Sequence, residues 1–213
     1  MFNFRKLRND RGFTLVELAI VLVIIGLILA GVIKGQELIN NAKMKRLYNS
    51  QKEIAAAIYT YYDRYQKYPG DDNTATTRWP GTFNGNGNGL IDGGAVGTNP
   101  APGTMFTCAA GTASETCAIW EHLRLSQILS GPAVAGTSRL NPTHPYGGTI
   151  GAANVAVQGL TVNWIGVSRT PENVAQILDV QNDDGDALTG SIRCLQAFAA
   201  PVTETTMSEF FKL

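Results

Sequence analysis

The segment that decides the fold is "RGFTLVELAIVLVIIGLILAGVIKG", residues 11–35. Its apolar part, Phe13 to Ile33, contains 21 residues and one acid, Glu17. At a rise of about 1.5 Å per residue this part would form a helix about 32 Å long, close to the roughly 30 Å hydrocarbon core of a bilayer. We therefore expect one membrane-spanning helix. A lone carboxylate there costs a few kcal/mol unless it is paired, so Glu17 is a candidate functional residue.

The residues that flank the apolar run predict its orientation. Before it stand Arg5, Lys6, Arg8 and Arg11, with Asp10 as the acid among them. This excess of positive charge places the N-terminus in the cytoplasm, although basic residues after the run weaken the contrast. No small-residue site of the A-x-A type follows the run, so we do not expect cleavage behind it by the ordinary secretory route.

The stretch "RGFTLVELAIVLVIIGLIL" closely resembles the signal of the type IV pilin-like family. In that signal a short basic leader ends in Gly, the next residue is Phe or Met, and a Glu follows four residues later in an apolar helix. The resemblance implies that a membrane-embedded prepilin peptidase cuts between Gly12 and Phe13, that Phe13 becomes N-methylated, and that the apolar helix is retained. It also implies that Glu17 acts in assembly.

A physical reason for the acid follows from this processing. Cleavage would release an α-amino group at Phe13, and this amine, on the same or a neighbouring subunit, could neutralise Glu17 when helices bundle. Because a broken buried pair typically costs about 3–5 kcal/mol, the pairing would select one register between subunits. The alternative is that Glu17 reaches the membrane interface and has no role.

The helical pattern continues beyond the membrane segment. Apolar residues recur at steps of three, four or seven, and no proline interrupts residues 13–68 before Pro69 and Gly70. The expected stripe consists of Leu38, Ala42, Leu47, Ile54, Ala57, Ile58 and Tyr61. We divide the chain into a leader (1–12), a transmembrane and assembly helix (13–33), its amphipathic continuation (34–68) and a globular periplasmic or extracellular domain (69–213).

Within the globular part, the pattern predicts a short helix over about 118–130 and strand candidates at 146–159, 160–168 and 191–199. Residues 174–180 fit either a strand or a short helix, and residues 69–104 read as a long surface loop. Together with the resemblance, these elements imply an α+β, pilin-like fold in which a long N-terminal helix packs on a C-terminal antiparallel β-sheet.

Two polar segments are candidates for calcium binding. Asn84, Asn86 and Asn88 alternate with glycine and precede Asp92, as in the first half of a calcium loop, but position twelve is Ala95 and the early ligands carry no charge. A Gly/Asn-rich series of turns is the alternative. The second segment clusters Asp179, Asn182, Asp183, Asp184 and Asp186 around Gly185. It is either an acidic turn or a cation site, with Asp183 and Asp184 as ligands.

Three cysteines, Cys108, Cys117 and Cys194, lie in the domain that would be exported, where disulfides can form. Cys108 and Cys117 close a short loop and are the preferred pair. Three reduced cysteines, or a bond from Cys194 to either of the others, remain alternatives.

Composition narrows the classes of function. The formal net charge is zero, and the body beyond the N-terminal segment is slightly acidic, which argues against nucleic acid as a partner. His122 and His144 lack metal-ligand spacing, and the Walker, G-x-S-x-G and H-E-x-x-H motifs are absent, so we expect no enzyme and no catalytic residues.

The resemblance implies a structural subunit of a type IV pilus or pilus-like filament, with self-association, the prepilin peptidase and the assembly machinery as partners. It implies one pass through the inner membrane before assembly, then a filament in the periplasm or at the cell surface. The alternatives are a pseudopilin of a type II secretion system, a minor tip subunit that binds a ligand or surface, and a membrane-anchored protein that never polymerises.

Overall fold

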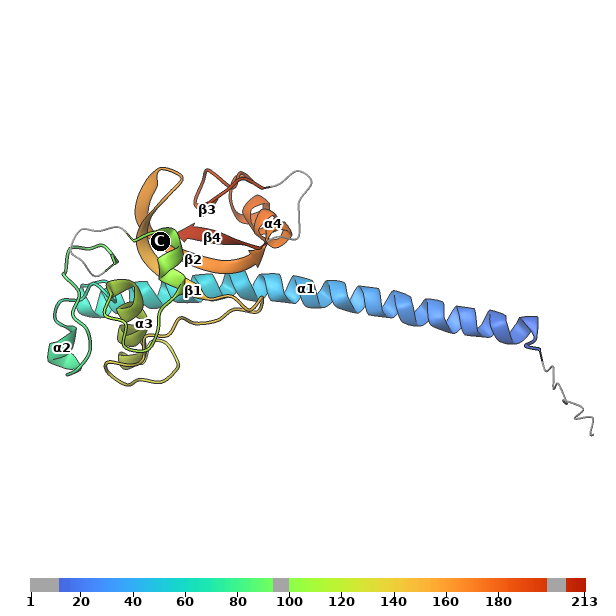
Figure 1. Cartoon of the computed structure of the whole chain (residues 1–213), viewed down its shortest axis with the longest axis horizontal. Coiled ribbons are helices and arrows are strands. Elements are labelled where there is room, and N and C mark those ends of the chain that lie inside the picture. Colours follow the sequence, from blue (N-terminus) through green and yellow to red (C-terminus); the bar gives the residue numbers. More distant parts are fainter. Residues whose placement is uncertain (1–11, 94–99, 199–205) are drawn as a thin grey trace, which may run out of the picture. The chain divides into compact units, whose positions relative to one another are not determined.

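A computed structural model describes residues 12–93, 100–198 and 206–213 (Figure 1). The expected leader, up to residue 11, and residue 95 of the first calcium candidate lie outside these ranges. The chain divides into two compact units, Met1–Ala42 and Lys43–Leu213. The fold is α+β and pilin-like, with a long N-terminal helix followed by a four-stranded antiparallel sheet.

Helix α1 runs from Leu15 to Tyr65 and contains 51 residues. It ends three residues earlier than the sequence predicts, because Gln66 takes a left-handed conformation with φ 54°. The Gln66 side-chain amide donates to the Asp63 carbonyl and so caps one of the last carbonyls of the helix. Pro69 then prevents the helix from resuming.

The part of α1 in the first unit exposes its apolar side chains. The mean hydropathy reaches 3.0 in an 18-residue window of α1, so the helix is long and apolar enough to cross a membrane. Of the large apolar side chains between Phe13 and Ile33, the least exposed, Ile25, is still 46 % exposed. Such a surface requires lipid or other helices to cover it.

The part of α1 in the second unit is amphipathic. Its buried residues follow three- and four-residue steps: Met44, Leu47, Gln51, Ile54, Ala57, Ile58 and Tyr61. This set corrects the predicted stripe at one end, because Leu38 is 62 % exposed and Ala42 is exposed. The physical reason is that the globular unit begins only at Lys43.

The sheet has the strand order β1-β2-β4-β3, with every neighbouring pair antiparallel. Strands β1 (Ile150–Val157) and β2 (Leu160–Pro171) form a hairpin. Its two-residue turn has positive φ at both Gln158 and Gly159, the backbone of a type I′ turn. Helix α4 (Glu172–Asn182) follows β2, and strands β3 (Ile192–Cys194) and β4 (Thr206–Lys212) complete the sheet.

The two faces of the sheet have different partners. One face, with Ile165 and its cross-strand neighbours Ala152 and Phe211, belongs to the same core cluster as α1 and helix α3 (Glu115–Leu125) (Figure 1). The other face packs against the 3₁₀ helix η1 (Pro102–Phe106). There Gly166 allows close approach, because an added Cβ would lie 2.7 Å from the Phe106 ring.

Several helices and strands have bounds or types that differ from the prediction. The helix expected over 118–130 is α3, which begins earlier, at Glu115, and ends earlier, at Leu125. Of the two alternatives for residues 174–180, the helix is confirmed, because these residues lie in α4. The strand expected over 191–199 is limited to β3, while its residue 199 lies outside the described ranges. Residues 69–104 contain the short helix α2 (Ala75–Arg78) as well as most of η1, and β4 was not predicted at all.

Candidate functional site

The N-terminus of α1 carries the residues that the sequence singled out. Thr14 precedes the first helical residue, and Glu17 lies in the first turn. The Glu17 N–H donates to Thr14 Oγ1 at 3.2 Å, while Glu17 Oε2 accepts from the Thr14 N–H and the Thr14 hydroxyl, each at 2.9 Å. This reciprocal arrangement is a capping box, in which a Thr and a Glu three residues later satisfy two otherwise unpaired backbone N–H groups.

The capping box gives Glu17 a local role but does not neutralise it. Both hydrogen bonds that it accepts come from neutral groups of Thr14. Among the described residues, the ion pairs involve other acids, and Glu17 forms none. Sequence reasoning recognised the charge at Glu17 but missed Thr14, although the T-x-x-E spacing is a known start signal for a helix.

The expected cleavage position lies directly before the helix. Gly12 is exposed and outside regular secondary structure, and Phe13 is 81 % exposed. A Cβ added to Gly12 would meet no atom within 4 Å. The fold of this chain therefore does not require glycine at position 12, and a requirement for it would have to come from a binding partner.

The glycines inside the apolar helix show the same property. Added Cβ atoms at Gly26, Gly31 and Gly35 would each meet nothing within 4 Å. Each costs up to about 1 kcal/mol of helix propensity relative to alanine. Close packing against another helix, or the general tolerance of membrane helices for glycine, accounts for them better than packing within the chain.

Comparison with known proteins identifies this segment. Residues 7–33 match the family model described as the prokaryotic N-terminal methylation motif, which is the prepilin signal of type IV pilins and pseudopilins. No curated protein and no solved structure matches the chain. The match covers the apolar helix and its flank, and it supports a subunit of the type IV pilin or pseudopilin class that is processed by a peptidase and anchored in the inner membrane.

The cysteines form one bond in the globular unit. Cys108 and Cys117 are joined as a disulfide, the pair that the sequence preferred, with Cα atoms 5.4 Å apart. The bond ties the segment after η1 to the first turn of α3. Cys194 is free and buried beside Met207 and Ala187, and burial raises the pKa of its thiol.

The first calcium candidate is a loop that satisfies its own hydrogen bonds. Asn84 Oδ1 accepts from the Thr76 N–H, and the side-chain oxygens of Asn86 and Asn88 accept from backbone N–H groups two residues later. The Asn86 and Asn88 amide nitrogens, not their oxygens, point to Asp92 Oδ2, at 3.4 and 3.1 Å. This geometry favours the Gly/Asn-rich series of turns over a calcium loop.

Two buried carboxylates hold that loop. Asp71 accepts from the N–H groups of Gly87, Asn88 and Gly89 at 2.6 to 3.0 Å. Glu115, at the start of α3, accepts from the backbone N–H groups at positions 86 and 92. Burial and the neighbouring Asp92 carboxyl group raise the pKa of Glu115 to about 7.

Asp183 and Asp184 lie in the loop after α4, together with Asp179 of that helix. The two histidines have structural partners instead. His122 Nδ1 accepts from the Gly70 N–H, and its Nε2 lies 2.8 Å from the Phe83 carbonyl oxygen. His144 Nε2 lies 2.7 Å from a strand carbonyl. Both imidazoles thus hold loops, and their positions give no support to a metal site.

Proposed function

We propose that this chain is a structural subunit of a type IV pilus or pilus-like filament. Prepilin peptidase removes the leader after Gly12, Phe13 becomes the methylated N-terminus, and the apolar helix polymerises. The chain spans the inner membrane once before assembly, and its globular unit then becomes part of the filament surface. The self-associating partner is a second copy of the same helix.

The observation that carries the proposal is the exposure of the apolar helix around a single acid. Every large apolar side chain from Phe13 to Ile33 is exposed, and the residues around them match the methylation motif. A plain membrane anchor would satisfy the exposure and could use Glu17 as a helix cap, but it would have no use for the charge of Glu17. A filament uses both, because helices that bundle side by side bury the apolar surface and bring the acid close to a released amine.

The motif is common to type IV pilins and to pseudopilins of type II secretion systems, and both build filaments from the same helix. The proposal therefore states how the subunit assembles, through its apolar helix, and applies to either system. Companion genes of a pilus or of a secretion cluster would assign the chain to one of the two systems.

Mass measurement tests the proposal directly. The chain purified from membranes should have the mass of residues 13–213 plus one methyl group, and it should be found in the sheared filament fraction. A chain that retains Met1 would contradict the proposal and favour the plain anchor. As an internal control, deletion of the prepilin peptidase should restore the mass of residues 1–213.

The assembly role of Glu17 has its own test. Glu17→Ala should still be cut, because the altered side chain lies beyond the cleaved bond, but it should enter filaments poorly. Glu37→Ala provides the control, since Glu37 lies on the same helix, is exposed and, among the described residues, forms its ion pair with Lys34. Equal filament yields from the two variants would remove Glu17 from the assembly mechanism.

A further inference from the structure

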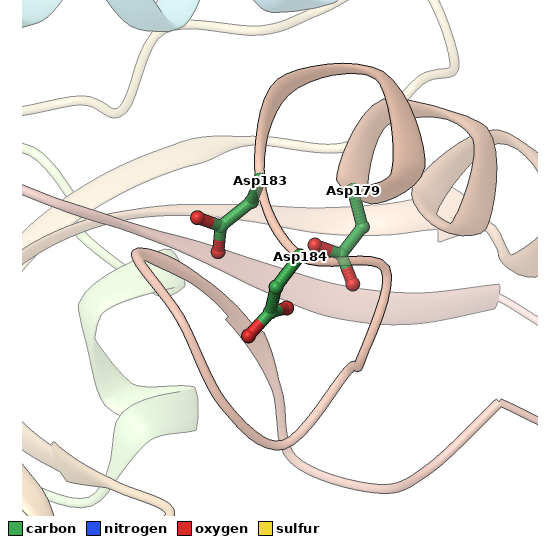
Figure 2. Close-up of side chains that lie close together, drawn as sticks. All are labelled: Asp179, Asp183 and Asp184. Atoms are coloured by element: carbon green, nitrogen blue, oxygen red, sulfur yellow. The ribbon is translucent and has the colours of Figure 1, made fainter.

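Three carboxyl groups gather where α4 ends. Asp179 belongs to α4, Asp183 is the residue that follows the helix, and Asp184 comes next in the loop (Figure 2). One oxygen from each lies within 4.8 Å of the others. Figure 2 shows the carboxyl groups of Asp183 and Asp184 on the loop, close to that of Asp179 on the helix.

Asp179 makes this cluster different from a solvated acidic turn. Its side chain is 1 % exposed, and among the described residues neither carboxylate oxygen has a hydrogen-bond partner of normal geometry. Burial, together with the charges of Asp184 and Asp183, raises the pKa of Asp179 to about 6, and the nearby Gly185 N–H opposes that rise only in part. A buried polar group without a partner is rare in folded proteins and requires an explanation.

The two outer carboxylates are already held in place. Asp183 accepts from the N–H groups of Ser191 and Ile192 and from the Ser191 hydroxyl. Asp184 accepts from the Asp186 N–H and the Thr189 hydroxyl. These donors are neutral, so they orient the carboxylates without removing their charge. The loop is thus preorganised around a concentration of negative charge.

The end of the helix adds negative charge to the cluster, and Arg193 offsets it only in part. The C-terminal end of a helix is the negative end of its dipole, and the last turn of α4 contains no basic residue. The positive charge of Arg193 favours the ionised form of Asp184, but the Arg193 guanidinium donates its hydrogen bonds to the carbonyls of Gly190 and Gln158.

A second buried acid lies behind Asp179. Glu209 of β4 is fully buried, and neither of its carboxyl oxygens has a hydrogen-bond partner in the part of the chain that the structure describes. Burial and the charge of Asp179 both raise the pKa of Glu209. A positive charge next to Asp179 would lower the cost of burying both acids.

We propose that Asp179, Asp183 and Asp184 bind a calcium ion, which fastens the end of α4 to the loop that leads into β3. All three donors are hard carboxylate oxygens, which suit Ca²⁺, whereas Zn²⁺ prefers nitrogen and sulfur ligands that this cluster lacks. The exposed side of Asp184 leaves room for water to complete the six to eight ligands that Ca²⁺ takes. Three carboxylates and a partly open shell correspond to a dissociation constant on the order of 10⁻⁴–10⁻³ M.

Thermal unfolding of the full-length chain in detergent, after removal of metals with a chelator, tests the site. Calcium at roughly 100-fold above its dissociation constant should raise the Tm by about 5–10 °C. Magnesium should raise it less, because its strict octahedral geometry fits a loop of this kind poorly. An unchanged Tm in calcium would overturn the proposal.

The variant Asp179→Asn should change the Tm in two ways that test the proposal. Without calcium this variant should have a higher Tm than the original chain, because it removes a buried charge that has no partner. With calcium it should show no further rise. Asp63→Asn, which alters an exposed acid near the end of α1, should respond to calcium as the original chain does. A full calcium response in Asp179→Asn would refute the assignment.

If Asp179→Asn does not fold, Asp184→Asn carries the test, since Asp184 is exposed and its loss leaves the core intact. Calorimetric titration with calcium should then show at least a tenfold loss of affinity relative to Asp63→Asn. Equal affinities would overturn the proposal. Because the test measures calcium and stability in the monomeric chain, its result is independent of filament assembly.

Discussion

Glu17 has two physical roles in this structure, as one half of a capping box and as a charge inside an apolar helix, and paired substitutions separate them. Glu17→Gln removes the charge but keeps a side chain that can complete the box, because Gln also serves at this position. Thr14→Ala keeps the charge but removes the hydroxyl that donates to Glu17 Oε2 and accepts from the Glu17 N–H. Each variant thus deletes one role.

The expected magnitudes differ enough to decide between the roles. Loss of the cap should weaken the helix start by about 1 kcal/mol, or roughly fivefold in an equilibrium. Loss of one partner of a buried ion pair typically costs about 3–5 kcal/mol, which corresponds to a hundredfold or more in subunit association. If charge pairing drives assembly, Glu17→Gln should therefore almost abolish filaments, while Thr14→Ala should lower their yield only modestly.

The assay compares sheared filaments with the pool of subunit that stays in the membrane, after mass measurement has confirmed cleavage in every variant. Glu37→Gln is the control for removing an acid from the same helix. Normal filament yield from Glu17→Gln would refute the charge-pairing reasoning. A Thr14→Ala variant as defective as Glu17→Gln would show that the cap, rather than the charge, is what assembly requires.

Three further predictions follow from the described contacts. Gly12→Leu should block removal of the leader without changing the thermal stability of the chain, because an added Cβ meets nothing within 4 Å, and mass measurement with a melting curve checks both. Cys117→Ser should lower the free energy of unfolding by about 2–3 kcal/mol in denaturant titrations, since it opens the loop to Cys108, and added reductant should lower it no further. Cys194→Ser keeps this disulfide, so reductant should destabilise that variant as much as it destabilises the original chain. Glu115 has a pKa of about 7 in the fold against 4.5 in the unfolded chain, so the folded state binds more protons between these values and loses stability as pH rises through them. Glu115→Gln should remove that part of the pH dependence of the Tm, and an identical pH profile in the variant would contradict the assigned burial.

The N-terminal half of the fold could be predicted from sequence because its determinants are local. Length, hydropathy and the absence of proline define a helix without reference to any other part of the chain, and Gly12, Phe13 and Glu17 are recognised by their spacing alone. The error at Leu38 and Ala42 has a different origin. Both residues continue the apolar period, but periodicity does not reveal where the globular unit begins.

The sheet was harder to predict, in part because strand β4 has an acidic residue at a core position. Strand β4 was missed since Glu209, although fully buried, interrupts the apolar pattern of its neighbours Phe210 and Phe211. Residues 174–180 were ambiguous because a short apolar run fits a strand or a helix equally well. Whether such a run forms a strand or a helix depends on contacts with residues distant in the sequence. These contacts cannot be read from one sequence alone.

The two calcium candidates illustrate what burial adds to a sequence pattern. Asp71 and Asp179 are acids near glycine-rich turns, and each is 1 % exposed in the structure. Asp71 is surrounded by three backbone N–H groups, which supply the hydrogen bonds that its buried charge requires. Among the residues that the structure describes, Asp179 has no donor in normal hydrogen-bond geometry, only the nearby Gly185 N–H, and it lies close to two other carboxylates. The sequence suggested calcium for both loops, but the buried charge of Asp71 already has its donors, and the proposed calcium site therefore lies at Asp179 alone.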